Sequence, residues 1–168
     1  MAVSEKLFQR LMQANELGVR LEIIGGLPIW EAHPVLKHQR AVDRIRESLK
    51  KPPTQDVGGC ACLHYADVYV RFGDGSLLRP DISIFCREPD EQEEAISLLP
   101  EAVIEIVSKG YEAKDLEIAP RFYLSQGIKD IIIFDPSTLL VLHIRKNGAQ
   151  RLVSPVNISL ECGCVCIV

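Results

Sequence analysis

The stretch RPDISIFC at positions 79–86, followed by EAVIEIVS at 101–108 and DIIIFDP at 130–136, decides the fold of this chain. Each segment contains an apolar run that is too short for a helix and rich in β-branched residues. We therefore predict strands at 82–86, 102–107 and 131–134. The middle run is apolar at every position except Glu105, which indicates a central strand covered on both faces.

Glu105 and Asp81 are the candidate metal ligands. A buried carboxylate needs a partner, either a cationic side chain or a metal ion. Asp81 opens the strand before that of Glu105, so adjacent strands could bring the two carboxylates together. Magnesium is held by a few oxygen ligands, with water completing its octahedron. The alternatives are an ion pair for Glu105 and a turn-capping role for Asp81.

The chain as a whole has the composition of a globular protein. It has 168 residues, of which 47% are hydrophobic and 25% charged, which suits one domain with its own core. No apolar run is long enough to span a membrane, and the first residues do not form a signal peptide. We therefore expect a cytoplasmic protein. Its net charge of −4 means that any binding to nucleic acid depends on a local basic patch.

Several further elements follow from local signals. We predict an N-terminal helix within residues 1–19, with Ser4 as its N-cap. Gly-Gly at 25–26 predicts a hairpin of strands 21–24 and 27–30, and Asn-Gly at 147–148 predicts another. A loop is expected at 54–58, and an acidic loop at 88–94.

The helix predicted at 36–50 carries the basic region of the chain. Its cationic side chains are Lys37, Arg40, Arg44, Arg46, Lys50 and the adjoining Lys51. One interpretation is a solvated helix with ion pairs, and the other is a face that contacts phosphates. In the second interpretation, His38, Arg40 and Arg44 are the candidate nucleic-acid contacts.

The six cysteines have a strand-like spacing. Cys60 and Cys62 are two residues apart, and so are the cysteines at 162, 164 and 166, so each set would share one face of a strand. Thiols alternating along a strand wrap a metal ion poorly, and buried cysteines behave as small hydrophobes. We expect reduced thiols that pack in the core, with a metal or redox site as the alternative.

Taken together, these residues resemble the Uma-type restriction endonuclease family, a branch of the PD-(D/E)xK nuclease superfamily. The resemblance covers about residues 20–165. Its elements are LEIIGG at 21–26, HQR at 38–40, RPD at 79–81, VIEIVS at 103–108, Asp115 with Tyr123, and GIKD at 127–130 running to Asp135-Pro136.

The resemblance implies an α/β (α+β) fold with a restriction-endonuclease-like core. We expect a mixed central β-sheet flanked by helices, with extra β-hairpins. It also implies hydrolysis of DNA phosphodiester bonds by a metal-dependent endonuclease that uses Mg²⁺ or Mn²⁺. Asp81 and Glu105 then hold the metal and take part in catalysis. DNA is the expected partner, and a homodimer would suit cleavage of both strands.

The expected catalytic lysine is missing from this chain. Val107 stands two residues after Glu105, and Ala119 stands at the helix position that the family uses. Lys114 is the best substitute, so we name it as a catalytic candidate. Pro120 suggests a helix that starts late or is distorted in its first turn. The alternative function is a catalytically degenerate nuclease fold that binds nucleic acid or a protein, and a third is a cysteine-based metal or redox protein.

Three other residues have structural roles as alternatives to a place in the site. Asp115 is either an N-cap of the helix that follows or a site residue. Tyr123 is expected to pack on its helix face without a catalytic role. Asp135, before Pro136, is expected to be a turn residue.

Overall fold

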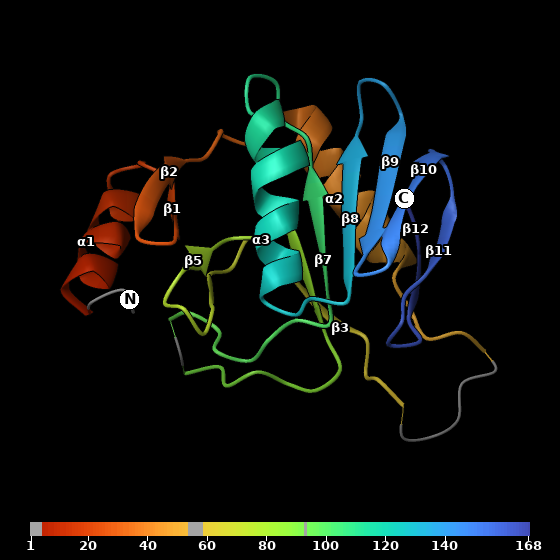
Figure 1. Ribbon diagram of the computed structural model, residues 1–168, viewed down its shortest axis with the longest axis horizontal. Helices are drawn as coiled ribbons and strands as arrows, with labels where there is room; N and C mark the ends of the chain where they lie inside the picture. Colours follow the sequence, from red (N-terminus) through yellow and green to blue (C-terminus); the bar gives the residue numbers. More distant parts are fainter. Residues whose placement is uncertain (1–4, 54–58, 93) are drawn as a thin grey trace.

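The computed structural model describes residues 5–53, 59–92 and 94–168 (Figure 1). The Ser4 N-cap and the loop predicted at 54–58 lie outside the described residues, as does one position of the acidic loop. Among the described helices, none has the length and apolar composition needed to cross a membrane.

A six-stranded mixed sheet forms the centre of the fold. In spatial order its strands are β10 (Gly148–Val153), β9 (Leu140–Arg145), β8 (Asp130–Asp135), β7 (Ala102–Ile106), β6 (Ile82–Phe85) and β3 (Leu63–Ala66). Only β7 and β8 run parallel among these neighbours. The strands predicted from the three apolar runs are β6, β7 and β8, so the mixed central sheet is confirmed.

Helices cover both faces of this sheet. Helix α2 (Leu36–Ser48) lies behind the sheet in Figure 1, and α3 (Ala119–Ser125) lies in front of it. Ile104 and Ile106 of β7 pack in the core cluster that includes α2, whereas Val103 packs in the cluster that includes α3. Both faces of β7 are therefore buried, which is why its sequence is almost continuously apolar.

Further elements extend the fold beyond the central sheet. Helix α1 (Glu5–Glu16) packs beside a second sheet, which contains β2 (Leu27–Trp30), β1 (Leu21–Ile24), β5 (Leu77–Leu78) and β4 (Val70–Arg71). Gly25 and Gly26 adopt φ angles of 57° and 85° between β1 and β2, which forms the predicted hairpin turn. Near the C-terminus, β11 (Asn157–Ser159) pairs with β12 (Val165–Ile167).

A π-helical turn, η1 (Lys114–Ile118), leads directly into α3. The sequence predicted a distortion near Pro120, and the structure places it in the turn just before that residue. Pro120 lies at the start of α3, directly after this turn, and has no amide to donate to the preceding helical carbonyls. Ala119 is completely buried at the junction.

The prediction for the cysteines is wrong in two respects. Cys60 and Cys62 lie before β3 rather than in a strand. Disulfides join Cys60 to Cys86 and Cys62 to Cys164, so these four are not reduced thiols. The strand-parity argument failed because the chain turns at Cys62, whose φ is 54°, and does not continue as a pleated strand.

Candidate metal-binding and catalytic site

Asp81 and Glu105 lie next to each other across β6 and β7. Ile82 pairs with Ile104 in antiparallel register, which sets the two carboxylates on neighbouring positions. The backbone amide of Asp81 donates a 3.3 Å hydrogen bond to Oε2 of Glu105, and the amide of Ile106 donates a 2.7 Å bond to Oδ2 of Asp81. The sheet register therefore brings the two predicted residues together.

The carboxylate of Glu105 is buried without a cationic partner. Its side chain points to the face covered by α3, where the hydroxyl of Tyr123 donates a 2.6 Å hydrogen bond to Oε1. Within the described residues, no lysine or arginine forms an ion pair with it, so the ion-pair alternative is not what the structure contains. Burial, followed by the charge of Asp81, raises the pKa of Glu105 well above its ordinary value.

His38 contacts Asp81 from the opposite side. Its Nε2 lies 3.1 Å from Oδ1 of Asp81, and the ring is buried at the start of α2. Burial lowers the pKa of His38, but the hydrogen bond and charge of Asp81 act against it, so that the pKa lies above its ordinary value. Arg40 and Arg44 instead lie on the exposed side of α2. The three candidate nucleic-acid contacts are thus divided between the site and the surface.

Lys114 reaches the site from η1. Its Nζ lies 2.6 Å from Oε2 of the fully buried Glu22, 3.9 Å from Oε1 of Glu31 and 4.0 Å from Oδ1 of Asp115. Burial lowers the pKa of Lys114, whereas the charges of Glu22, Glu105 and Glu31 raise it above its ordinary value. The ammonium group is therefore a permanent cation at neutral pH.

Glu22 and Glu31 extend the acidic network beneath Lys114. The other carboxylate oxygen of Glu22 accepts a 2.7 Å hydrogen bond from the backbone amide of Arg79. Burial, followed by the nearby Glu22, raises the pKa of Glu31 to about 9, although the charges of Lys114 and Arg79 act in the opposite direction. The Arg79 side chain lies 3.8 Å from Glu31 and also pairs with Asp67.

Asp115 is a site residue in position rather than a helix cap. Its Oδ2 accepts a 3.0 Å hydrogen bond from the amide of Ser108, just after β7. The turn that contains Asp115 begins without a side-chain cap. Burial raises the pKa of Asp115 to about 6. This contact links the end of β7 to η1 and closes one side of the site.

These side chains line a hollow with an empty volume of about 550 Å³, part of it open to solvent. Among the described residues, its lining contains the carboxyl groups of Glu31, Asp67, Asp81, Glu105 and Asp115. The same lining holds only one lysine, one arginine and one histidine. Oxygen ligands in excess of cations are the environment that Mg²⁺ prefers, so the residues present fit a divalent ion.

The sheet, the two covering helices and the acid pair on adjacent strands define the restriction-endonuclease-like class of nuclease folds. The sequence model of the Uma2 family, described as "Putative restriction endonuclease", matches residues 5–161. The chain therefore belongs to this family.

Comparison with solved structures supports the same fold. The chain is similar to a crystal structure from Anabaena variabilis, described as "a putative nuclease belonging to DUF820". The TM-score is 0.64 with 18% sequence identity, and the match covers 84% of this chain and 82% of the other. No curated protein matches the chain in sequence.

Sequence reasoning missed three members of the network. Tyr123 was assigned to packing, yet its hydroxyl contacts Glu105. Glu22 is an isolated acid in the apolar run LEII, the same signal that identified Glu105, and it was not used. Glu31 follows a strand and carried no distinguishing signal.

Proposed function

We propose that this chain is a metal-dependent nuclease that hydrolyses DNA phosphodiester bonds at the site formed by Asp81 and Glu105. The observation that carries the proposal is the buried Glu105 beside Asp81, with no cationic side chain paired to it among the described residues. A buried carboxylate beside a second, half-buried one is costly unless a cation shares the pair. A bound Mg²⁺ or Mn²⁺ would offset both the cost of burying Glu105 and the repulsion between Glu105 and Asp81.

Asp81 and Glu105 would hold the metal, and the residues around them would fix their orientation. A divalent ion at such a site supplies an activated water and stabilises negative charge on the scissile phosphate. Tyr123 orients Glu105 through its hydrogen bond, while His38 and the amide of Ile106 orient Asp81. Such supporting contacts reduce the freedom of metal ligands and tune their affinity.

Lys114 would take the role of the lysine that is missing at position 119. Its ammonium group lies in the same hollow as the acid pair and remains protonated at neutral pH. A fixed cation there acts on the negative charge that develops at the phosphate, and does not act as a base. For this role, the ammonium group of Lys114 must stabilise the phosphate charge while it remains paired with Glu22.

DNA would approach along α2. Arg40 and Arg44 are exposed on this helix, and His38 of the same helix enters the site. Arg40 and Arg44 form an exposed cationic face on the helix whose buried side carries His38, and such a face suits a phosphate backbone as ligand. Cleavage of both strands would require two sites, which a homodimer provides.

A cleavage assay tests the proposal directly. Plasmid and single-stranded DNA are incubated with Mg²⁺ or Mn²⁺ and wild type, Asp81→Asn or Glu105→Gln. We expect both substitutions to abolish cleavage and divalent binding by calorimetry. Asp135→Asn is the matched control, because Asp135 binds only the turn at 135–138. Cleavage that persists in Asp81→Asn or Glu105→Gln contradicts the proposal.

A second candidate function rests on Ala119. This residue is completely buried where the family lysine is expected, so no side chain there can reach a phosphate. A nuclease fold without cleavage would then bind nucleic acid or a protein. Wild type that binds divalent ions and DNA, yet leaves DNA intact, would favour this second function.

A further inference from the structure

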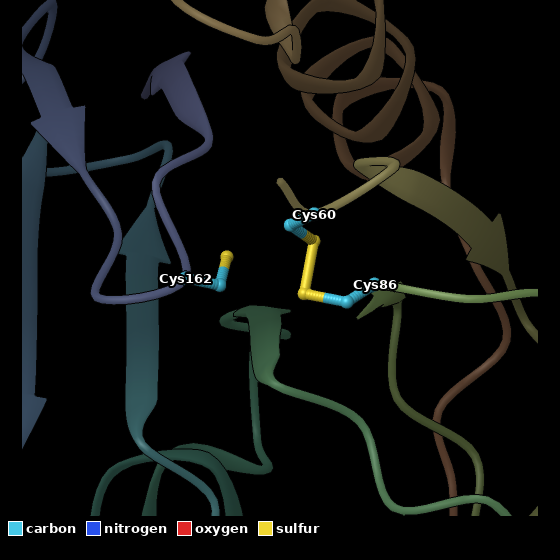
Figure 2. A group of neighbouring side chains, drawn as sticks. All are labelled: Cys60, Cys86 and Cys162. Atoms are coloured by element: carbon cyan, nitrogen blue, oxygen red, sulfur yellow. A yellow bond between two sulfur atoms is a disulfide. The ribbon is translucent and has the colours of Figure 1, made fainter. Parts of the chain in front are cut away.

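Five cysteine sulfur atoms converge at the end of the sheet remote from the acid pair. The sulfurs of Cys60, Cys86 and Cys162 lie within 4.8 Å of one another (Figure 2), and so do those of Cys60, Cys62 and Cys164. Cys60 belongs to both groups. The five residues come from three segments: the approach to β3, the end of β6 and the turn before β12. The fold therefore gathers soft sulfur ligands from distant parts of the sequence.

Both Cys-x-Cys segments, 60–62 and 162–164, turn the chain instead of continuing as pleated strands. The amide of Cys62 donates a 3.5 Å hydrogen bond to the sulfur of Cys60. Burial raises the pKa of the Cys162 thiol above its ordinary value, and the backbone of Cys164 acts against this shift without cancelling it. Positive φ angles of 54° at Cys62 and 100° at Gly163 turn the chain at both segments. Metals bind the thiolate form of cysteine, and metal binding itself releases the thiol protons.

The disulfides leave Cys162 as the one cysteine of the five-residue cluster that is not bonded. Cys60–Cys86 and Cys62–Cys164 are bonded, while Cys162 is a half-exposed free thiol beside the first pair. A thiolate within reach of a disulfide can exchange with it, so such a cluster does not hold a single covalent pairing firmly. A tetrahedral metal ion is bound by four thiolates at once, so the close approach of several sulfurs favours it.

We propose that the reduced protein binds one Zn²⁺ through Cys60, Cys86 and Cys162, with one thiolate of Cys62 or Cys164 as the fourth ligand. A dithiol reductant first converts each disulfide to two thiols and is itself oxidised to a disulfide, with two electrons and two protons transferred per bond. Zn²⁺ then replaces four thiol protons, which are released. Thiolates select zinc over harder ions.

The distances suit this ion. A Zn–S bond of about 2.3 Å places tetrahedral sulfurs about 3.8 Å apart. The sulfurs of each group lie within 4.8 Å of one another, a range that includes this separation once the disulfides are reduced. Cys86 and Cys162 are half-buried, which leaves a path for the ion, whereas Cys60 is buried. Bound zinc would fix the end of β6, the strand that Asp81 begins.

The two free cysteines provide the decisive comparison. Neither Cys162→Ala nor Cys166→Ala breaks a disulfide, and Cys166 belongs to neither sulfur group. The full-length protein is purified anaerobically in a phosphine reductant, and its zinc content is measured by mass spectrometry of the metal. We expect about one zinc per chain in wild type and Cys166→Ala, and almost none in Cys162→Ala. If the cysteines only form disulfides and bind no metal, the two variants should have the same zinc content.

Cobalt provides a second readout that distinguishes thiolates from the acid pair. Co²⁺ added to the reduced, metal-free chain should give the sulfur-to-cobalt charge-transfer band and the intense visible bands of a tetrahedral thiolate site. These bands should persist in Glu105→Gln, disappear in Cys162→Ala and be displaced by Zn²⁺. Absence of zinc and of charge-transfer bands in reduced wild type, or retention of both in Cys162→Ala, overturns the proposal.

Discussion

The hydroxyl of Tyr123 donates a 2.6 Å hydrogen bond to Oε1 of Glu105 inside the protein, where both side chains are buried. This contact joins α3 to the central strand β7 at the candidate site. It gives a buried carboxyl group a neutral donor in place of a cation, so a metal ion would not have to displace a paired side-chain cation to bind Glu105.

Removal of that donor should destabilise the protein. Tyr123→Phe keeps the ring but leaves a buried oxygen of Glu105 without its partner, so we expect the free energy of unfolding to fall by about 1–3 kcal/mol. Urea denaturation measures this change. Tyr65→Phe is the matched control, because Tyr65 hydrogen-bonds Glu88 at the surface, and its effect should stay within about 0.5 kcal/mol.

A double-mutant cycle assigns the loss to this contact. In the Glu105→Gln background, Tyr123→Phe should cost less than it does alone, by a coupling of about 0.5 kcal/mol or more. Strict additivity of the two substitutions would show that the ring, and not the hydrogen bond, carries the effect.

The ion pair of Lys114 with Glu22 should matter for both stability and activity. Lys114→Ala leaves the completely buried carboxyl group of Glu22 without its ion-pair partner, so we expect a loss of about 3–5 kcal/mol in unfolding free energy. The double variant Lys114→Met with Glu22→Gln removes both charges and should recover most of that loss.

The same double variant separates structure from catalysis. If Lys114 acts on the phosphate, the stable double variant should still bind Mg²⁺ by calorimetry but cleave DNA at least about tenfold more slowly than wild type. Cleavage at the wild-type rate would assign Lys114 a purely structural role.

Asp130 should govern part of the acid stability. Burial raises its pKa, but the hydrogen bonds of His143, the amide of Glu161 and Arg145 lower it below the ordinary value. A lowered pKa stabilises the fold above the unfolded value of about 3.9, and this stability is lost as pH falls through the folded pKa.

Urea denaturation across pH tests that dependence. The stability difference between wild type and Asp130→Asn should be constant above about pH 5 and shrink as pH falls below about 3.9. Asp43→Asn, on the exposed side of α2, serves as control. A difference that grows as pH falls would contradict the assignment.

The exposed arginines of α2 should contribute to binding of DNA. Arg40→Ala with Arg44→Ala should lower affinity for every DNA sequence alike. It should also reduce the slope of log K against log salt by about 0.9 per lost phosphate contact. Fluorescence anisotropy at several salt concentrations measures both effects.

Arg121→Ala is the matched control for this pair. Arg121 is exposed on α3, which covers the opposite face of the sheet from α2 (Figure 1). Its removal should leave affinity and salt slope unchanged. Equal effects of the α2 and α3 substitutions would mean that binding follows total charge and not a defined face.

The sequence by itself determined the strands of the central sheet and the pair Asp81 and Glu105. Their signals are local: short β-branched runs identify strands, and a lone acid in an apolar strand identifies a buried carboxylate. The turn at Gly25-Gly26 was equally local, because its dihedral requirements restrict the residue types. The hairpin signalled by Asn147-Gly148 is also present, but its turn is at 146–147, and Gly148 already pairs with Arg145.

Only the tertiary structure decided the partners of those residues. The contacts of Glu105 with Tyr123, of Asp81 with His38 and of Lys114 with Glu22 join segments whose separation in sequence carries no periodic signal. The gathering of five cysteines likewise depends on where the chain turns in space. Local pattern specifies which face a side chain occupies, whereas the packing of elements specifies what it meets there.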